Sequence, residues 1–152
     1  MRALLTALAL AAAPAAAAAA AATSIEVSQA WSRPAVAGGT GAGFLTLTNR
    51  GKAPDALTGA ESPVARKVEI HRTTMAGGVM KMGKVERVPV PPGGKVILAP
   101  GGHHLMLFGL TKALNAGDRV PATLSFASGT KVKVELVVGT GAGAPAMDHS
   151  HH

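Results

Sequence analysis

The 152-residue sequence contains no cysteine, no tyrosine, one tryptophan and three phenylalanines. Without cysteine, these residues can form no disulfide framework, thiolate zinc or iron–sulfur site, cysteine nucleophile, thioether-linked haem or lipid-modified cysteine. Any metal site must therefore use histidine, methionine or carboxylate side chains. The sequence has six histidines and six methionines.

The formal net charge is +7, from 15 Lys and Arg residues against 8 Asp and Glu residues. Such an excess can attract nucleic acid, an anionic membrane or an acidic protein partner. Here the basic residues are scattered, with no run longer than two, and few aromatic side chains could stack on bases. We therefore expect no nucleic-acid partner, and we interpret the charge as the basic surface of a soluble domain.

The N-terminal segment has the order of an export signal. Residues 1–22 contain Arg2, an apolar segment and a run of small residues that ends before Thr23. A membrane anchor is the alternative, because about 20 apolar residues can span a bilayer. Alanine favours membranes only weakly and Pro14 interrupts the segment. We therefore expect a cleaved signal peptide and a mature protein that begins near Thr23.

From residue 25 onward, short alternating segments are separated by turns rich in Gly, Pro, Asn and Asp, a pattern typical of β-strands. We expect no helix beyond the signal except for a short helical turn around residues 110–115. The expected strands cover residues 25–32, 43–49, 55–60, 66–73, 79–86, 95–99, 103–109, 119–127 and 131–138. This pattern predicts one all-β domain over residues 23–138, an antiparallel sandwich or barrel.

Residues 139–152 differ in composition from the domain. A flexible Gly/Ala/Pro linker ends in Met147, His149, His151 and His152. A leftover affinity tag is one interpretation, but three interrupted histidines make a poor tag. Weak, labile metal binding by these four side chains is the other interpretation, and the sequence leaves both open.

Seven potential soft-metal ligands lie between residues 71 and 106: His71, Met75, Met80, Met82, His103, His104 and Met106. A single methionine is more often a packing residue than a ligand. The strand pattern argues against packing here, because Leu105 and Leu107 take the core-facing positions and leave His104 and Met106 together on the other side. His71 and Met82 would complete a four-ligand set on the solvent-facing side, where an ion can be passed on.

Two imidazoles and two thioethers are the ligands of a soft metal ion. Thioethers are poor ligands for Mg²⁺, Ca²⁺ or Zn²⁺ and suit Cu(I). The ligands are neutral, so the site favours the monovalent ion over Cu(II). Methionine also persists in an oxidising compartment, where thiols would form disulfides. The residues therefore predict an exported Cu(I)-binding domain.

The spacing of the four residues resembles the H-x(10)-M-x(21)-H-x-M motif of the periplasmic copper chaperone family PCu(A)C. Ten residues separate His71 from Met82, twenty-one separate Met82 from His104, and one separates His104 from Met106. Further segments resemble the family's opening strands and ligand segments, namely residues 30–34, 44–49, 68–71, 79–82 and 100–106. The resemblance covers roughly residues 25–138.

This resemblance implies a cupredoxin-like Greek-key β-sandwich that binds one Cu(I) through His71, Met82, His104 and Met106 in the periplasm. It further implies delivery of copper to the Cu(A) centre of cytochrome c oxidase or a related haem–copper oxidase. The partner is then an oxidase subunit or another copper chaperone, with membrane contact only through the acceptor, and we expect a monomer. The family's His- and Met-rich C-terminal extension, which can hold Cu(II), is similar to residues 147–152.

Other functions fit the sequence less well. An electron-transfer cupredoxin needs a thiolate ligand, which is absent. A copper enzyme needs an open coordination position, and no acid–base carboxylate other than Glu69 stands near the motif, so we expect no catalysis. An adhesion or assembly module does not account for the spacing. The alternative that stays open is a periplasmic copper-storage or resistance protein without a dedicated oxidase acceptor.

Overall fold

The computed structural model describes residues 24–140, so the expected signal segment and the Met/His residues of the tail lie outside the described residues. Within this range the chain forms ten strands and no helix. The strands are β1 (Ile25–Ser32), β2 (Gly41–Asn49), β3 (Asp55–Glu61), β4 (Ala65–Ala76), β5 (Val79–Lys84), β6 (Val88–Val90), β7 (Lys95–Leu98), β8 (His103–Leu110), β9 (Arg119–Phe126) and β10 (Lys131–Val138).

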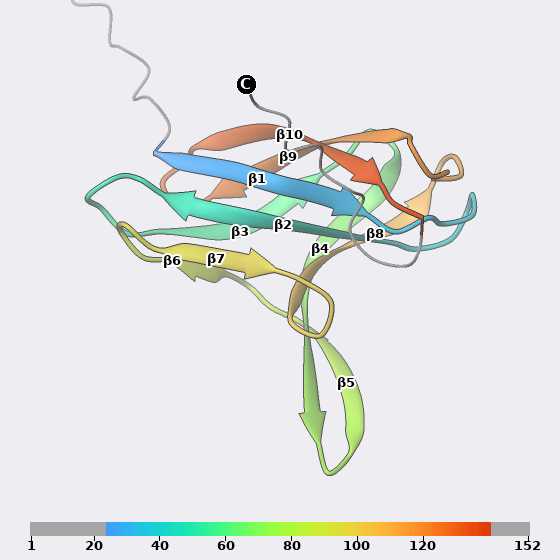
Figure 1. Cartoon of the computed structure of the whole chain (residues 1–152), viewed down its shortest axis with the longest axis horizontal. Coiled ribbons are helices and arrows are strands. Elements are labelled where there is room, and N and C mark those ends of the chain that lie inside the picture. The colour runs from blue at the N-terminus through green and yellow to red at the C-terminus, as the bar shows by residue number, and fades with distance from the viewer. Residues whose placement is uncertain (1–23, 141–152) are drawn as a thin grey trace, which may run out of the picture.

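Seven of these strands close on themselves, in the order β4-β8-β2-β1-β10-β9-β3 (Figure 1). The circle is completed where Ala60 of β3 pairs with Val68 of β4. The pairing of β1 with β10 is parallel, whereas the other strand pairs are antiparallel. The expected cupredoxin-like Greek-key β-sandwich is therefore confirmed.

Alternation along the strands builds the core. In β9, Val120, Leu124 and Phe126 point inward and are buried, whereas intervening positions are exposed or half-buried. Each fully buried side chain of this kind contributes about 1.5–3 kcal/mol through removal of apolar surface from water. At Gly43 of β2, a Cβ atom would lie 3.0 Å from Leu136 Cδ1, so glycine permits the close approach of the strand to the core.

One hairpin extends beyond the barrel (Figure 1). It consists of the end of β4, a turn at Gly77 and Gly78, and β5, and we call residues 73–84 the arm. The two glycines have φ values of 59° and 77°, which suit a two-residue type I′ turn and are strained for other residues. Every residue of β5 is exposed, so beyond the buried Thr73 the arm is held by strand pairing rather than by burial.

The structure departs from the sequence-based strands in a few places. It adds β6, a three-residue strand that contains Pro89 and pairs with β3, and it extends β4 to Ala76. The expected helical turn around residues 110–115 is wrong. Leu114 is buried there and exchanges two backbone hydrogen bonds with Ala35, at 2.8 and 3.1 Å. Residues 24–140 contain no apolar helix of membrane-spanning length.

Candidate metal centre

Strand β8 separates core residues from candidate ligands as its alternation predicts. Leu105 and Leu107 are fully buried in the main core. His104 and Met106 lie on the opposite face of the strand, with Met106 half-buried. The expectation that this face is solvent-facing is wrong for His104, whose exposed fraction is 3%. A second, smaller buried layer covers this side of the sheet.

His71 lies directly beside His104. The two residues are opposite each other in the pairing of β4 with β8, and the next same-face pair is Glu69 with Met106. The ring centroids of His71 and His104 are 6.1 Å apart. A metal–imidazole bond is about 2 Å long, so a single ion between the two rings can reach both. Three of the four candidate ligands thus stand on two adjacent strands of the barrel.

The His104 ring is held in one orientation with a free donor atom. Its Nδ1–H donates to the Gly102 carbonyl at 3.2 Å, and the same carbonyl accepts the Thr73 backbone N–H at 3.1 Å. Burial lowers the pKa of His104 below its usual value, so the ring stays neutral at neutral pH. Its Nε2 is buried without a hydrogen-bond partner. A buried, unprotonated nitrogen of this kind is costly unless it binds something, and a metal ion fits it.

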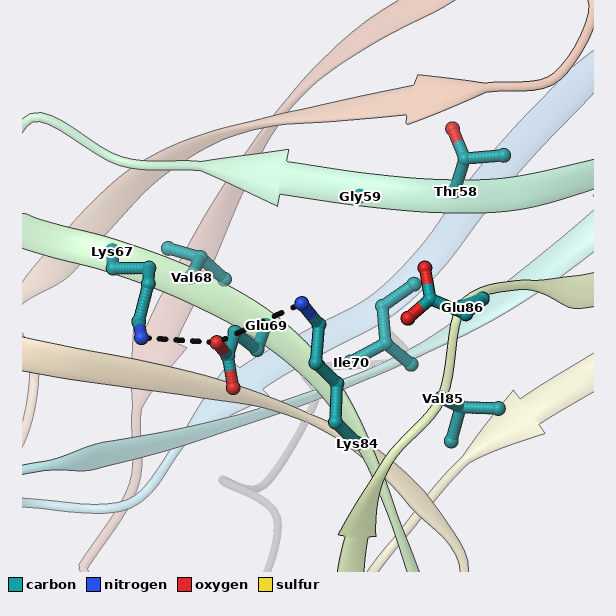
Figure 2. Close-up of a pocket in the computed structure, with 9 residues that line it drawn as sticks. All are labelled: Thr58, Gly59, Lys67, Val68, Glu69, Ile70, Lys84, Val85 and Glu86. Atoms are coloured by element: carbon teal, nitrogen blue, oxygen red, sulfur yellow. Dashed lines mark ion pairs between the residues drawn. The ribbon is translucent and has the colours of Figure 1, made fainter.

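Glu69 orients the second imidazole. Its carboxylate accepts a 2.8 Å hydrogen bond from His71 Nε2 and forms ion pairs with Lys67 at 3.0 Å and Lys84 at 3.9 Å. Figure 2 shows the two ammonium groups on either side of this carboxylate. The His71 and Lys67 hydrogen bonds lower the pKa of Glu69, which keeps it ionised. A carboxylate that holds one ring nitrogen leaves the other as the metal donor, a common arrangement around metal-binding histidines.

Aromatic rings form the wall behind the two histidines, a feature missed by the sequence reasoning. Trp31 packs on Phe44 at 4.6 Å between centroids, and Phe44 lies 6.2 Å from His104. On the other side, Phe108 lies 5.7 Å from His71. The Arg33 guanidinium lies over the Phe44 ring at 5.4 Å. The wall keeps water from one side of the site and places a fixed positive charge at its rim.

A bulge in β1 puts Trp31 on this wall. The register with β2 shifts between Ser28 and Trp31, and Gln29 within the shift has a φ of 50°. A bulge inserts an extra residue and so reverses which face the following side chains take. Without it, Trp31 would share the inward face of Ile25 and Val27. The positive φ at a non-glycine residue is visible only in the structure.

Met82 reaches the site from the arm. It pairs with Thr73, one same-face step along β4 from His71, and its exposed fraction is 61%. A cavity of about 430 Å³ is lined by Met82, Met106 and His104, together with Met80. Its other lining residues include Arg33, Phe44, Thr73 and Pro100. His71 is not among the lining residues and joins the group through its contact with His104.

No group of three or more His, Asp or Glu side chains that could hold a metal occurs in residues 24–140. The described part of the chain therefore has no site of carboxylates and imidazoles for a hard metal ion. A four-ligand set around the two histidines needs the thioethers of Met82 and Met106. The tail residues Met147, His149, His151 and His152 lie outside the described residues.

Solved structures with this fold define its class. The copper-bound PCuAC domain from PmoF2 superposes with a TM-score of 0.64 and 26% identity, over 76% of this chain and 92% of that one. The solution structure of CuI-DR1885 from Deinococcus radiodurans gives a TM-score of 0.60 and 30% identity, over 82% and 85%. The protein is thus similar to a class of small copper-binding β-sandwiches.

Sequence comparison identifies the family. A family model described as "Putative lipoprotein LpqE-like" matches residues 25–138. A putative lipoprotein of Leifsonia xyli subsp. xyli is 35% identical over 121 residues, which are 79% of this chain and 72% of that protein. The chain belongs to the LpqE-like family, of PCu(A)C type, as its motif spacing predicts.

Proposed function

We propose that this protein is an exported copper chaperone that binds one Cu(I) through His71, Met82, His104 and Met106. The observation that carries the proposal is the buried, unpartnered Nε2 of His104 at a cavity also lined by Met82 and Met106. Copper-bound relatives of the same fold support the choice of metal. Copper is the cargo of the protein, and the ligands hold it only until an acceptor takes it.

The donor set fits Cu(I) better than other common ions. Two neutral imidazoles and two thioethers form a soft set, which suits a soft monovalent cation and disfavours Zn²⁺ or Mg²⁺. Among the described residues, Glu69 is the carboxylate bonded to a histidine of the proposed site, and Lys67 and Lys84 already neutralise it. The site therefore has little negative charge with which to stabilise Cu(II).

The geometry suits release as well as binding. His104 is enclosed by the barrel, whereas Met82 is exposed on the arm. An incoming ligand from an acceptor can replace the Met82 thioether first, while the imidazoles still hold the ion. Copper remains Cu(I) throughout, so each step exchanges one ligand for another and needs no electron donor or acceptor.

The acceptor that we propose is the Cu(A) centre of cytochrome c oxidase or of a related haem–copper oxidase, reached directly or through a partner copper chaperone. The basic charge favours an acidic docking surface. Export to the periplasm is supported by the N-terminal pattern and by the lipoprotein description of the family. In these 152 residues no cysteine is present to carry a lipid thioether, so we propose a cleaved signal. We further propose a monomer that meets the membrane only through its acceptor.

A competition titration tests the site. Cu(I) is added to the protein in the presence of a Cu(I) chelator, for the wild type and for Met106→Leu. We expect the wild type to bind one equivalent of Cu(I) tightly and the variant to bind it with a much lower affinity. Wild-type affinity in Met106→Leu would overturn the proposed ligand set. Repeating the titration with Cu(II), with and without residues 139–152, tests the proposed tail site separately.

Transfer tests the acceptor. The Cu(I)-loaded protein is mixed with the copper-free Cu(A) domain of an oxidase, and copper in each protein is quantified after separation. Movement of copper to the oxidase domain supports the chaperone. Copper that stays bound, together with reduced copper tolerance of cells that lack the protein, supports the storage or resistance alternative.

A further inference from the structure

Two methionines at the tip of the arm have no packing function in the fold. Met75 and Met80 have exposed fractions of 67% and 64%. Methionine normally fills gaps in a core. These two side chains are exposed, so they do not stabilise the fold by removing apolar surface from water. Of the six exposed large hydrophobic residues in the described part of the chain, four lie on the arm: Met75, Val79, Met80 and Met82.

The turn sets these two thioethers side by side. Gly77 and Gly78 close the hairpin, and Met75 and Met80 are directly opposite each other in the pairing of β4 with β5. Directly opposite residues of an antiparallel pair lie on the same face, with Cβ atoms about 4.5–5.5 Å apart. Two flexible side chains that start so close together can bring both sulfur atoms to one ion.

The pair is also continuous with the candidate metal centre. Along the same face of the arm, Met75 and Met80 are followed by Thr73 and Met82, and then by His71 beside His104. Each same-face step along a strand is about 7 Å. Met80 lines the same cavity as His104 and Met106. A row of thioethers thus leads from the tip of the arm into the cavity.

We propose that Met75 and Met80 form a second, weaker Cu(I) site, through which the ion enters and leaves the four-ligand centre. This inference rests on the proposed function and adds a step to it. Copper remains Cu(I), and Met80 stays bound while Met75 is exchanged for Met82. The tip site is weaker because it has two thioethers and no imidazole and because water surrounds it. It therefore holds the ion briefly and releases it inward or to an acceptor.

The experiment follows each methionine separately in the full chain. The methionine methyl groups are labelled with ¹³C, and their NMR signals are recorded while Cu(I) is added to two equivalents. Cu(I) is diamagnetic, so the signals stay sharp enough to assign. The first equivalent should shift the Met82 and Met106 signals, and the second should shift those of Met75 and Met80. Unchanged Met75 and Met80 signals through two equivalents would overturn the proposal.

A double variant tests the role in transfer. Met75→Leu with Met80→Leu keeps the apolar surface and the size of the side chains but removes both sulfur atoms. We expect affinity for the first equivalent within about 3-fold of wild type, and release to a chelator slowed about 10-fold. Val79→Leu, at the same tip on the other face of the hairpin, is the control and should change neither. Release at the wild-type rate in the double variant would refute the transfer step.

These outcomes separate the tip site from the proposed function. If the Met82 and Met106 signals do not respond to copper, the four-ligand centre fails, whereas the Met75 and Met80 signals still decide the tip site. If the arm instead serves only as an apolar docking surface, the leucine double variant releases copper normally and binds its acceptor normally. That result would contradict the proposal, because leucine preserves apolar contact.

Discussion

The two halves of the candidate site differ in how the chain holds them. His71, His104 and Met106 stand on barrel strands, and His104 is fixed by the Gly102 carbonyl within a buried layer. Met82 stands on a hairpin whose second strand is exposed at every position. Under the proposed function, the barrel half would retain the ion and the arm half would exchange it.

The difference follows from what each half is packed against. The barrel ligands share strands with core residues, so folding itself sets their positions. The arm has no apolar layer against which to pack, and strand pairing and the Gly77–Gly78 turn alone define its register. The Gly102 carbonyl couples the two halves, because it accepts hydrogen bonds from both His104 and the Thr73 backbone. Lys84 of the arm adds a second link through its 3.9 Å ion pair with Glu69.

The largest expected effect is a difference between barrel and arm in how much a substitution lowers the free energy of unfolding. Leu105→Ala removes a side chain with an exposed fraction of 0%, so the free energy of unfolding should fall by about 2–5 kcal/mol. Met82→Ala, on the arm, should change it by no more than about 0.5 kcal/mol. Urea denaturation of both variants measures this. Comparable losses would mean that the arm is part of the cooperative core.

The next effect concerns the retaining half. His104→Leu removes a ligand, and Cu(I) affinity should fall by more than about 100-fold, since loss of a ligand's support alone costs 10–100-fold. The apo fold should keep most of its stability, because the change removes a buried Nε2 that has no partner. It also removes the hydrogen bond from Nδ1, but the Gly102 carbonyl still accepts the Thr73 backbone N–H. Chelator competition and thermal denaturation measure the two quantities. His103→Leu, its neighbour outside the cavity lining, is the matched control and should keep wild-type affinity.

A smaller effect is expected from the residue that supports His71. Glu69→Gln weakens the hydrogen bond to His71 and removes the charge that Lys67 and Lys84 neutralise. Cu(I) affinity should fall about 10-fold, within the range for residues that orient a metal ligand. The control is Glu86→Gln, because Glu86 and Glu69 line one pocket on this side of the barrel (Figure 2). An unchanged affinity in Glu69→Gln would show that the His71 ring needs no carboxylate.

The smallest effect lies in the barrel, away from the site. Burial opposes ionisation of Asp55, but hydrogen bonds from Ser128 and the Ala56 backbone outweigh it and lower its pKa. Because the folded-state pKa is below the unfolded value, the stabilisation is complete above about pH 4 and is lost as the pH falls through the folded-state pKa.

Asp55→Asn should therefore lower the free energy of unfolding by about 1 kcal/mol at pH 7. The difference in this free energy between wild type and variant should become smaller as the pH approaches 3. Denaturation at a series of pH values checks this, and Cu(I) affinity at pH 7 should not change. If the difference in free energy of unfolding between wild type and variant were the same at every pH, ionisation of Asp55 would not stabilise the fold.

Much of the barrel could be predicted from the sequence because alternation records which side of a strand meets the core. The same alternation correctly separated His104 and Met106 from Leu105 and Leu107. The arm shows where this signal ends. Beyond Thr73 the strand does not face the core, so its side chains do not alternate between buried and exposed positions. The extension of β4 to Ala76 therefore has no signal in the sequence.

Other features depend on tertiary contacts that a single sequence does not encode locally. Val88–Val90 is too short to show a period and contains a proline, yet it pairs with β3. The bulge at Gln29, which turns Trp31 toward the site, breaks the alternation from which faces are inferred. The burial of His104 likewise depends on Phe44, which another strand supplies.

X-ray absorption spectroscopy at the copper edge tests the central claim most directly. The full chain, loaded with one equivalent of Cu(I), should give a first coordination shell that contains both nitrogen and sulfur scatterers. In Met106→Leu the sulfur contribution should fall while the nitrogen contribution remains. A shell of nitrogen and oxygen alone in the wild type would contradict a site that joins barrel imidazoles to thioethers.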